Sequence, residues 1–334
     1  MTAFNPVRAS WRQLVAGLAA LPLSLGPFVV YANLTPEGRL LRDRVHVAVV
    51  PPDLPVLSDE ETAAALAHAP RYTDAVMPLV YHGIGEGDGT DGGLALSPER
   101  FGEHVATLEA AGMSFVTAAE VAAAFDGGTR LPPNAVMISF DDGRADAMLW
   151  ATPLLEAAGA RATMFVITDS AGSHSVYYES WPRLRALAKD GTWDLESHTA
   201  ASHVTQRTSA GELPVLTSRG PGESPAEYRA RVSDDLDRAS DALLDHAGRT
   251  PVAFAYPFGA HGADRHNDPD IEALLARAVG ARYRIAFHQD DQEHMALATP
   301  DSPPLGLRRL TVGDWTGPEL LARIVAAQQR TAGP

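Results

Sequence analysis

Cysteine is absent from this chain of 334 residues, and basic residues are few relative to acidic ones. Without cysteine there is no disulfide framework, no thiolate-bound zinc or iron–sulfur cluster and no thiol nucleophile. The 27 Lys and Arg face 42 Asp and Glu, which gives a formal net charge of -15 and excludes nucleic acid as an expected partner. A bound metal would have to use carboxylates and some of the 12 histidines.

Charged residues are also missing from one long stretch, between Arg12 and Glu37. Within it, residues 14–34 are long enough to cross a bilayer core of about 30 Å as a helix that rises about 1.5 Å per residue. Arg8 and Arg12 precede this segment. Positive charge on this side predicts a cytoplasmic N-terminus and an exported remainder. A shorter signal-peptide core, cleaved after Ala32, is the alternative, and it leads to export as well.

The chain is therefore predicted to have three parts. Residues 1–36 form a cytoplasmic tip and a membrane anchor or signal segment, and residues 37–76 form a Pro-rich linker. From 77 to 330, near-continuous apolar runs that suit buried parallel strands alternate with helical patterns. No Walker loop accompanies this alternation, so we expect no nucleotide cofactor. The pattern favours an α/β fold, a (β/α) barrel with its site at the C-terminal ends of the strands.

Two adjacent carboxylates, Asp141 and Asp142, follow the apolar run at 135–140. They stand at the end of a predicted strand, where barrel enzymes place their chemistry. Neighbouring residues at a strand end point in different directions, so one carboxylate can bind a metal while the other faces a water. An ordinary Asp-Asp-Gly turn is the alternative interpretation.

Two histidines, His198 and His203, follow another predicted strand at 192–197. Five residues apart on a helix they would lie about 140° from each other, so they can share a metal only from a loop. Two imidazoles and a carboxylate form a three-ligand catalytic set that leaves a position for water. A pair of solvated loop histidines is the alternative. Apart from His82, the other histidines are expected at the surface or in linkers.

Taken together, these segments resemble the metal-dependent polysaccharide deacetylases, carbohydrate esterase family 4 with the NodB homology domain. FDDG at 140–143 and the segment from His198 to His203 carry the resemblance, which covers roughly residues 77 to 325. The five-residue histidine spacing and the early Tyr-His at 81–82 are similar to the branch that deacetylates poly-N-acetylglucosamine. The resemblance implies a distorted (β/α) barrel.

The resemblance also implies roles for the matching residues. Asp142, His198 and His203 would bind one divalent ion, with Zn²⁺ expected. Asp141 would be the general base on a water, and His82 the acid that protonates the leaving amine.

The third motif of the family is matched at residues 254–259, with departures. The backbone N–H of Phe258 would hold the oxyanion, and Tyr256 lies in the same substrate segment. The family's usual arginine, which orients the base, is replaced here by Ala255. Arg308 or Arg309 on the last predicted strand would then have to orient Asp141.

The function implied is that of an exported hydrolase, membrane-anchored or secreted, that removes acetyl groups from N-acetylglucosamine units of a cell-surface or extracellular polysaccharide. Its partners would be this acetylated polysaccharide and, through the N-terminal segment, the membrane. A deacetylase that acts on peptidoglycan, chitin or an O-acetylated glycan is one alternative. A glycan-binding protein without catalytic activity is the other, and the replacement at Ala255 is the feature that favours it.

Overall fold

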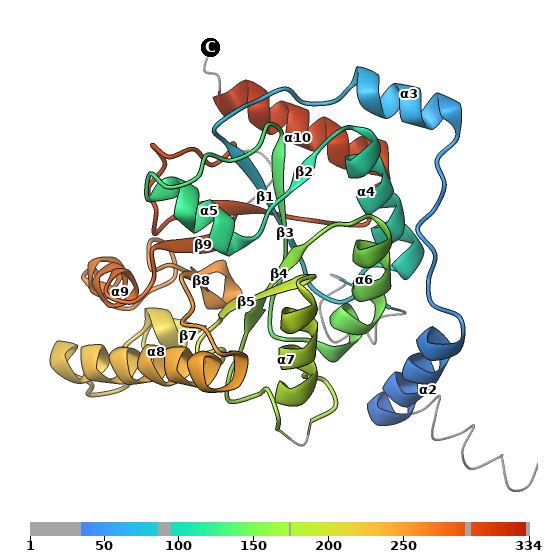
Figure 1. Ribbon diagram of the computed structural model, residues 1–334. Helices are drawn as coiled ribbons and strands as arrows, with labels where there is room; N and C mark the ends of the chain where they lie inside the picture. The colour runs from blue at the N-terminus through green and yellow to red at the C-terminus, as the bar shows by residue number, and fades with distance from the viewer. Residues whose placement is uncertain (1–34, 86–94, 174, 291–294, 332–334) are drawn as a thin grey trace, which may run out of the picture. The chain divides into compact units, whose positions relative to one another are not determined.

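The computed structural model describes residues 35–85, 95–173, 175–290 and 295–331, and it divides into two units, residues 1–50 and 51–334 (Figure 1). The described part of the first unit is helix α2 (Pro36–Val49), whose N-cap Thr35 accepts a hydrogen bond from the Gly38 backbone N–H. The predicted anchor or signal segment at 14–34 lies outside the described residues. None of the described helices is both long and apolar enough to span a bilayer.

A closed barrel of seven parallel strands forms the centre of the second unit, which confirms the predicted (β/α) barrel (Figure 1). The order around the barrel is β1-β10-β9-β8-β5-β4-β3, and pairing of β1 with β3 closes it; the short β2 (Ser114–Phe115) extends the sheet beside β3. The barrel strands are β1 (Val76–Tyr81), β3 (Ala135–Phe140), β4 (Ala162–Val166), β5 (Trp193–Ser197), β8 (Ala253–Ala255), β9 (Ile285–Asp290) and β10 (Leu307–Thr311).

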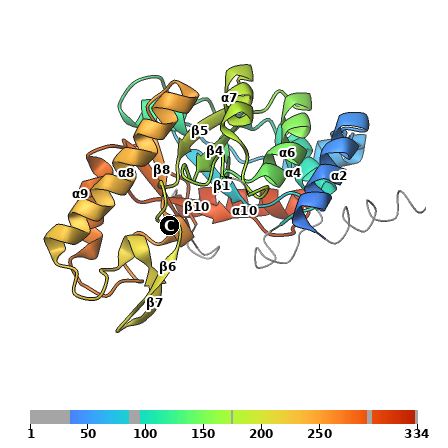
Figure 2. The ribbon, with the colours of Figure 1, turned by 90° about the horizontal axis from the view of Figure 1, so that it is seen from below.

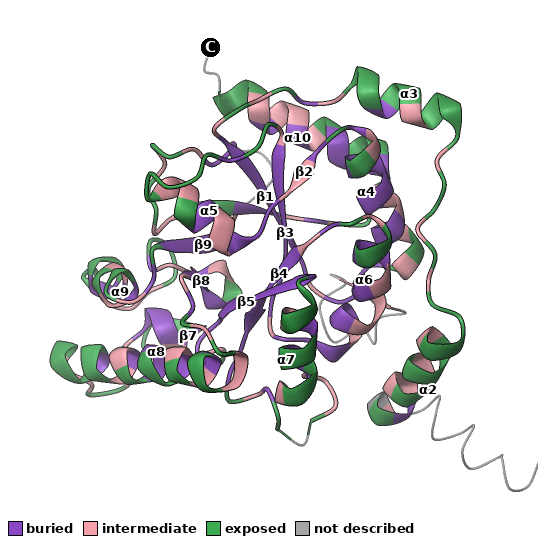
Figure 3. Cartoon of the chain, viewed as in Figure 1, coloured by how far each residue is buried: buried purple, intermediate pink, exposed green. Residues whose placement is uncertain are grey.

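The strands are buried on both faces, as their near-continuous apolar sequences predict (Figure 3). Alternate residues point to opposite sides of a strand, so Met137 of β3 joins the cluster in the barrel interior with Phe165 and Phe287. Val136 and Ile138 of the same strand pack outward with the surrounding helices. Helix α5 (Ala118–Phe125) covers the N-terminal end of the barrel, which leaves the opposite end for a site.

Most of the other helices surround the barrel (Figures 1 and 2). The N-cap residues Ser97 of α4 and Ser224 of α8 each accept a hydrogen bond from the backbone N–H three residues later. Beyond the strand ends, β6 (Thr205–Thr208) and β7 (Gly211–Pro214) form an antiparallel hairpin that projects from the barrel (Figure 2). The helices are α3 (Asp59–Ala67), α4 (Pro98–Ala110), α6 (Ala145–Ala157), α7 (Trp181–Asp190), α8 (Pro225–Ala247), α9 (Ile271–Gly280) and α10 (Gly317–Thr331).

Two histidines correct the expectation that they lie at the surface. His104 of α4 is fully buried. Its Nδ1 lies 3.3 Å from the hydroxyl of Tyr81, and its Nε2 lies 2.6 Å from the carbonyl of Trp315. These partners satisfy both ring nitrogens, so burial leaves no polar atom unpaired. His288 on β9 is also buried.

The close contact between α10 and α4 gives a stability prediction. A Cβ at Gly317 would lie 2.0 Å from Thr107 Oγ1 and 2.8 Å from Thr107 Cβ. Gly317→Ala should therefore lower the free energy of unfolding by about 1–3 kcal/mol, as overpacking does. Gly306→Ala is the matched control, since a Cβ there meets nothing within 4 Å. Urea denaturation of both variants tests this, and equal stabilities would contradict the close packing.

Candidate active site

The residues singled out from the sequence meet at the C-terminal ends of two barrel strands. Asp141 and Asp142 come directly after β3, and His198 comes directly after β5. Parallel strands end at the same rim of a barrel, so these residues lie close together. His203, in the loop after β5, lies at this rim as well, with its Nε2 3.5 Å from Asp142 Oδ1. The structure thus brings together all four side chains of the predicted base and metal set.

Asp142, His198 and His203 are the one group of possible metal ligands among the described residues. Asp142 Oδ1 lies 3.6 Å from His198 Nε2 and 3.5 Å from His203 Nε2, and one ligand atom of each residue lies within 4.8 Å of the others. Ligands about 2.0–2.2 Å from a tetrahedral ion lie a little over 3 Å apart, so these separations suit a single ion.

The polar atoms of this group also fit a cation. Asp142 Oδ1 is buried and has no hydrogen-bond partner among the described residues, an arrangement that is costly unless something else compensates its charge. His198 Nδ1 lies 2.8 Å from the carbonyl of Ala255, so we assign the ring proton to Nδ1, which leaves the Nε2 lone pair facing Asp142. Burial lowers the pKa of His198 to about 4, with Asp141 partly opposing this, so the ring is neutral near pH 7. Neutral imidazole is the form that binds metal.

Backbone strain is concentrated at the same end of the barrel. Asp142, Thr199 and Phe258 have φ values of 73°, 76° and 57°, in the left-handed region that residues other than glycine rarely adopt. For the β-branched Thr199, which follows a ligand candidate directly, this conformation is a genuine outlier. Strained backbone of this kind tends to occur where function requires a fixed side-chain position.

The second carboxylate, Asp141, is held by an arginine. Arg309 donates from Nη1 to Asp141 Oδ1 and from Nη2 to Oδ2, both at 2.7 Å, and Nη1 also donates to Ser139 Oγ. Both charged groups are buried. Burial opposes ionisation of Asp141, but the charge and hydrogen bonds of Arg309, together with His198 and His82, outweigh it, so the pKa of Asp141 lies well below its usual range. Of the two predicted arginines, Arg309 contacts Asp141, whereas Arg308 is exposed.

His82 lies beside these residues, because β1 pairs with β3 and the register places Tyr81 opposite Phe140. Its Nε2 lies 3.3 Å from the side-chain amide nitrogen of Gln289. Its Nδ1 is buried and has no hydrogen-bond partner in the described part of the chain. Burial lowers the pKa of His82, and the charges of Asp141 and Asp142 partly oppose that shift.

The two residues predicted for the oxyanion and substrate segment are placed differently. Phe258 lies in the 3₁₀ turn η2 (Pro257–Gly259), is 39% exposed, and its ring centroid is 4.3 Å from that of His203. The side chain of Tyr256 is buried, and its hydroxyl donates to the carbonyl of Leu305. The structure therefore brings Phe258 to the metal group but not the side chain of Tyr256.

Three residues near the site were not singled out from the sequence. Arg144, two positions after Asp142, is buried and donates to the hydroxyl of Tyr177, with its guanidinium 4.6 Å from the Tyr177 ring centroid. Burial raises the pKa of Tyr177, and the nearby charge of Asp142 adds to that shift while Arg144 opposes it. Gln289 is the third such residue. Only Arg144 had a local signal, its position directly after the FDDG segment.

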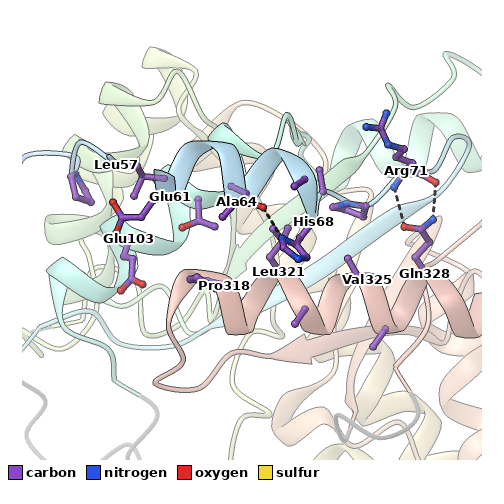
Figure 4. Close-up of a pocket in the computed structure, with 18 of the residues that line it drawn as sticks. Leu57, Glu61, Ala64, His68, Arg71, Glu103, Pro318, Leu321, Val325 and Gln328 are labelled. Carbon is purple, nitrogen blue, oxygen red and sulfur yellow. Dashed lines mark hydrogen bonds between the residues drawn. The ribbon is translucent and has the colours of Figure 1, made fainter. Parts of the chain in front are cut away.

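A separate cavity of about 1070 Å³ lies between α3, α4 and α10 (Figure 4). Its lining includes Leu57, Ala64 and Leu321, and Gln328 at its edge bonds the backbone of Arg71. It contains none of the residues predicted for the site. Its volume alone therefore assigns it no function.

Comparison with known proteins agrees with this geometry. Residues 128–270 match the polysaccharide deacetylase family. The poly-beta-1,6-N-acetyl-D-glucosamine N-deacetylase of Escherichia coli (strain K12) is 24% identical over 221 residues, which are 60% of this chain and 33% of that protein. The enzyme of the same name from Staphylococcus aureus (strain MRSA252) is 23% identical over 197 residues, 58% of this chain and 60% of that protein.

This chain thus spans about a third of the first relative and 60% of the second. Among solved structures, a de-N-acetylase from Aggregatibacter actinomycetemcomitans superposes with a TM-score of 0.62 at 21% identity, over 73% of this chain and 97% of that one. At this identity the likeness establishes the fold. The segment of this chain that matches the polysaccharide deacetylase family contains Asp141, Asp142, His198 and His203.

Proposed function

We propose that this domain is a metal-dependent hydrolase that removes acetyl groups from N-acetylglucosamine units of a cell-surface or extracellular polysaccharide. The observation that carries the proposal is the Asp142–His198–His203 group beside a buried carboxylate that Arg309 keeps ionised. The names of the two relatives support the choice of N-acetylglucosamine as the substrate unit.

Asp142, His198 and His203 would hold one divalent ion, and two imidazoles with one carboxylate suit Zn²⁺. When bound in such a site, Zn²⁺ polarises the acetyl carbonyl and lowers the pKa of a water ligand. The chain's own contribution begins with His198, whose Nδ1–H bond to Ala255 fixes the ring orientation.

Asp141 would act as the general base. Its Oδ2 lies 4.0 Å from His198 Nε2, so it stands next to the ligand group without belonging to it. Arg309 occupies one lone pair on each oxygen, and a carboxylate has further acceptor sites for the proton of the attacking water. Arg309 thereby supplies from β10 the contact that the family's arginine would supply from the position of Ala255.

The remaining steps would use Phe258 and His82. The family resemblance places tyrosine at the position of Phe258. A backbone N–H there can stabilise a developing oxyanion whatever the side chain, so phenylalanine in place of tyrosine leaves the donor intact. His82 would give a proton to the leaving amine, which departs poorly without one. We also propose that the domain acts outside the cytoplasm, anchored or secreted, since the apolar segment at 14–34 predicts export.

The experiment that tests this function is release of free acetate from a panel of acetylated glycans. The panel contains β-1,6-linked N-acetylglucosamine oligomers, chitin oligomers, peptidoglycan and an O-acetylated glycan. We expect release from the first substrate, its loss with a chelator, and a loss of about 10²–10⁴-fold in Asp141→Asn. Preference for another glycan would replace the substrate assignment. Acetate release that survives both the chelator and Asp141→Asn would contradict the proposed chemistry.

The two carboxylates should differ in metal binding. The purified protein should hold about one divalent ion, and His198→Ala, His203→Ala or Asp142→Asn should lower its affinity for the ion by about 10-fold or more. Asp141→Asn should keep the ion, because Asp141 is bound by Arg309 instead. His68→Ala, an exposed residue at the end of α3, is the control. Elemental analysis after dialysis measures occupancy, and equal metal loss in Asp141→Asn and Asp142→Asn would refute this division.

A further inference from the structure

Gln289 is the side chain in direct contact with His82. It lies near the end of β9, and its amide nitrogen is 3.3 Å from His82 Nε2. In the sheet it is paired with Arg309 of β10, so it lies next to the arginine that binds Asp141. A residue 207 positions away in sequence from His82 thus contacts the imidazole at the rim of the barrel.

The neighbouring turn η2 leaves space for Gln289. Gly259 has a φ of 65°, and a Cβ on it would lie 2.8 Å from Gln289 Cβ and 3.0 Å from the Gln289 backbone nitrogen. Only a residue without a side chain can pack this closely. The turn that carries Phe258 and the strand that carries Gln289 are therefore in direct contact, which fixes where the Gln289 side chain starts.

Gln289 contacts one nitrogen of His82 and leaves the other without a partner. Nδ1 of His82 is buried and unpaired among the described residues. The charged groups that act on this ring are Asp141, Asp142, Arg309 and Arg144. Nδ1 is therefore the ring nitrogen that no described residue engages.

A side-chain amide suits an imidazole that gains and loses a proton. Its NH₂ group can donate to an unprotonated Nε2, and after a 180° turn its carbonyl can accept from Nε2–H. One residue can therefore hold the ring both as the neutral Nδ1–H tautomer, in which Nε2 accepts, and as the imidazolium, in which Nε2–H donates and Nδ1–H can be given up. A carboxylate would accept only, and an apolar side chain would do neither.

We propose that Gln289 is a positioning residue for His82, holding Nε2 so that Nδ1–H is delivered to the leaving amine. This inference rests on the proposed function. In the step concerned, the C–N bond breaks, its electron pair stays on nitrogen, and that nitrogen takes the proton from Nδ1. His82 becomes neutral with its remaining proton on Nε2, and transfer of the proton that Asp141 took from water returns His82 to its charged form and Asp141 to its ionised form.

The test compares amide and ester hydrolysis in variants of the full chain. The substrates are a β-1,6-linked N-acetylglucosamine oligomer and 4-nitrophenyl acetate, whose phenolate leaves without needing a full proton. Gln289→Leu should lower kcat/KM on the oligomer by about 10-fold or more, as loss of a supporting partner does, with a loss of under about 3-fold on the ester. Gln289→Glu, which can still accept from Nε2–H, should restore most of the oligomer activity.

Two reference variants make the outcome specific. Gln328→Leu removes a glutamine that bonds Arg71 on another part of the domain and should leave both activities unchanged. His82→Ala should show the same selective loss as Gln289→Leu, or a larger one. Two results would overturn the role of Gln289 and leave the proposed function standing. One is an equal loss on both substrates in Gln289→Leu. The other is no loss in Gln289→Leu while His82→Ala shows the selective loss. A His82→Ala variant without selective loss would instead refute the proposed acid.

Discussion

The ion pair between Arg309 and Asp141 joins β10 to the end of β3 inside the barrel, across the intervening strand β1. Both groups are buried, and removing either from water costs several kcal/mol unless the other compensates it. The bidentate geometry supplies that compensation and fixes the orientation of the carboxylate. It also separates the roles of two adjacent aspartates, because Asp141 is paired with a cation of the chain while Asp142 Oδ1 has no hydrogen-bond partner among the described residues.

The same ion pair provides the arginine contact that the family pattern would place at the position of Ala255. Ala255 has no side chain that could do this. Its backbone carbonyl accepts the Nδ1–H of His198, and a backbone atom does not depend on residue type. The arginine that contacts Asp141, the proposed base, comes from a different strand, β10. The geometry around Asp141 is thus kept by the fold, since all barrel strands converge on one rim, and the sequence position of the cation can change.

Several features were predictable because their signals are local. Apolar runs, caps such as Ser97 and Ser224, and carboxylates or histidines directly after a strand can each be recognised within a few residues. The choice between Arg308 and Arg309 depended on which face of β10 points inward, and the sequence leaves this open because Leu307 and Leu310 are both buried. The contact of Gln289 with His82 has no local signal at all, since β1 and β9 are far apart in the sequence and lie near each other only because both pair with β10.

The claim that Arg309 acts through Asp141 is tested most directly by a double-mutant cycle for turnover, with bound metal measured in every variant. Arg309→Met should lower kcat on the N-acetylglucosamine oligomer by up to about 10²–10⁴-fold, the range of general-base catalysis, while the metal is retained. In the Asp141→Asn background the same substitution should cost less than about 2-fold, because residues that act as a unit are not additive. Loss of kcat by the same factor in both backgrounds would contradict the account.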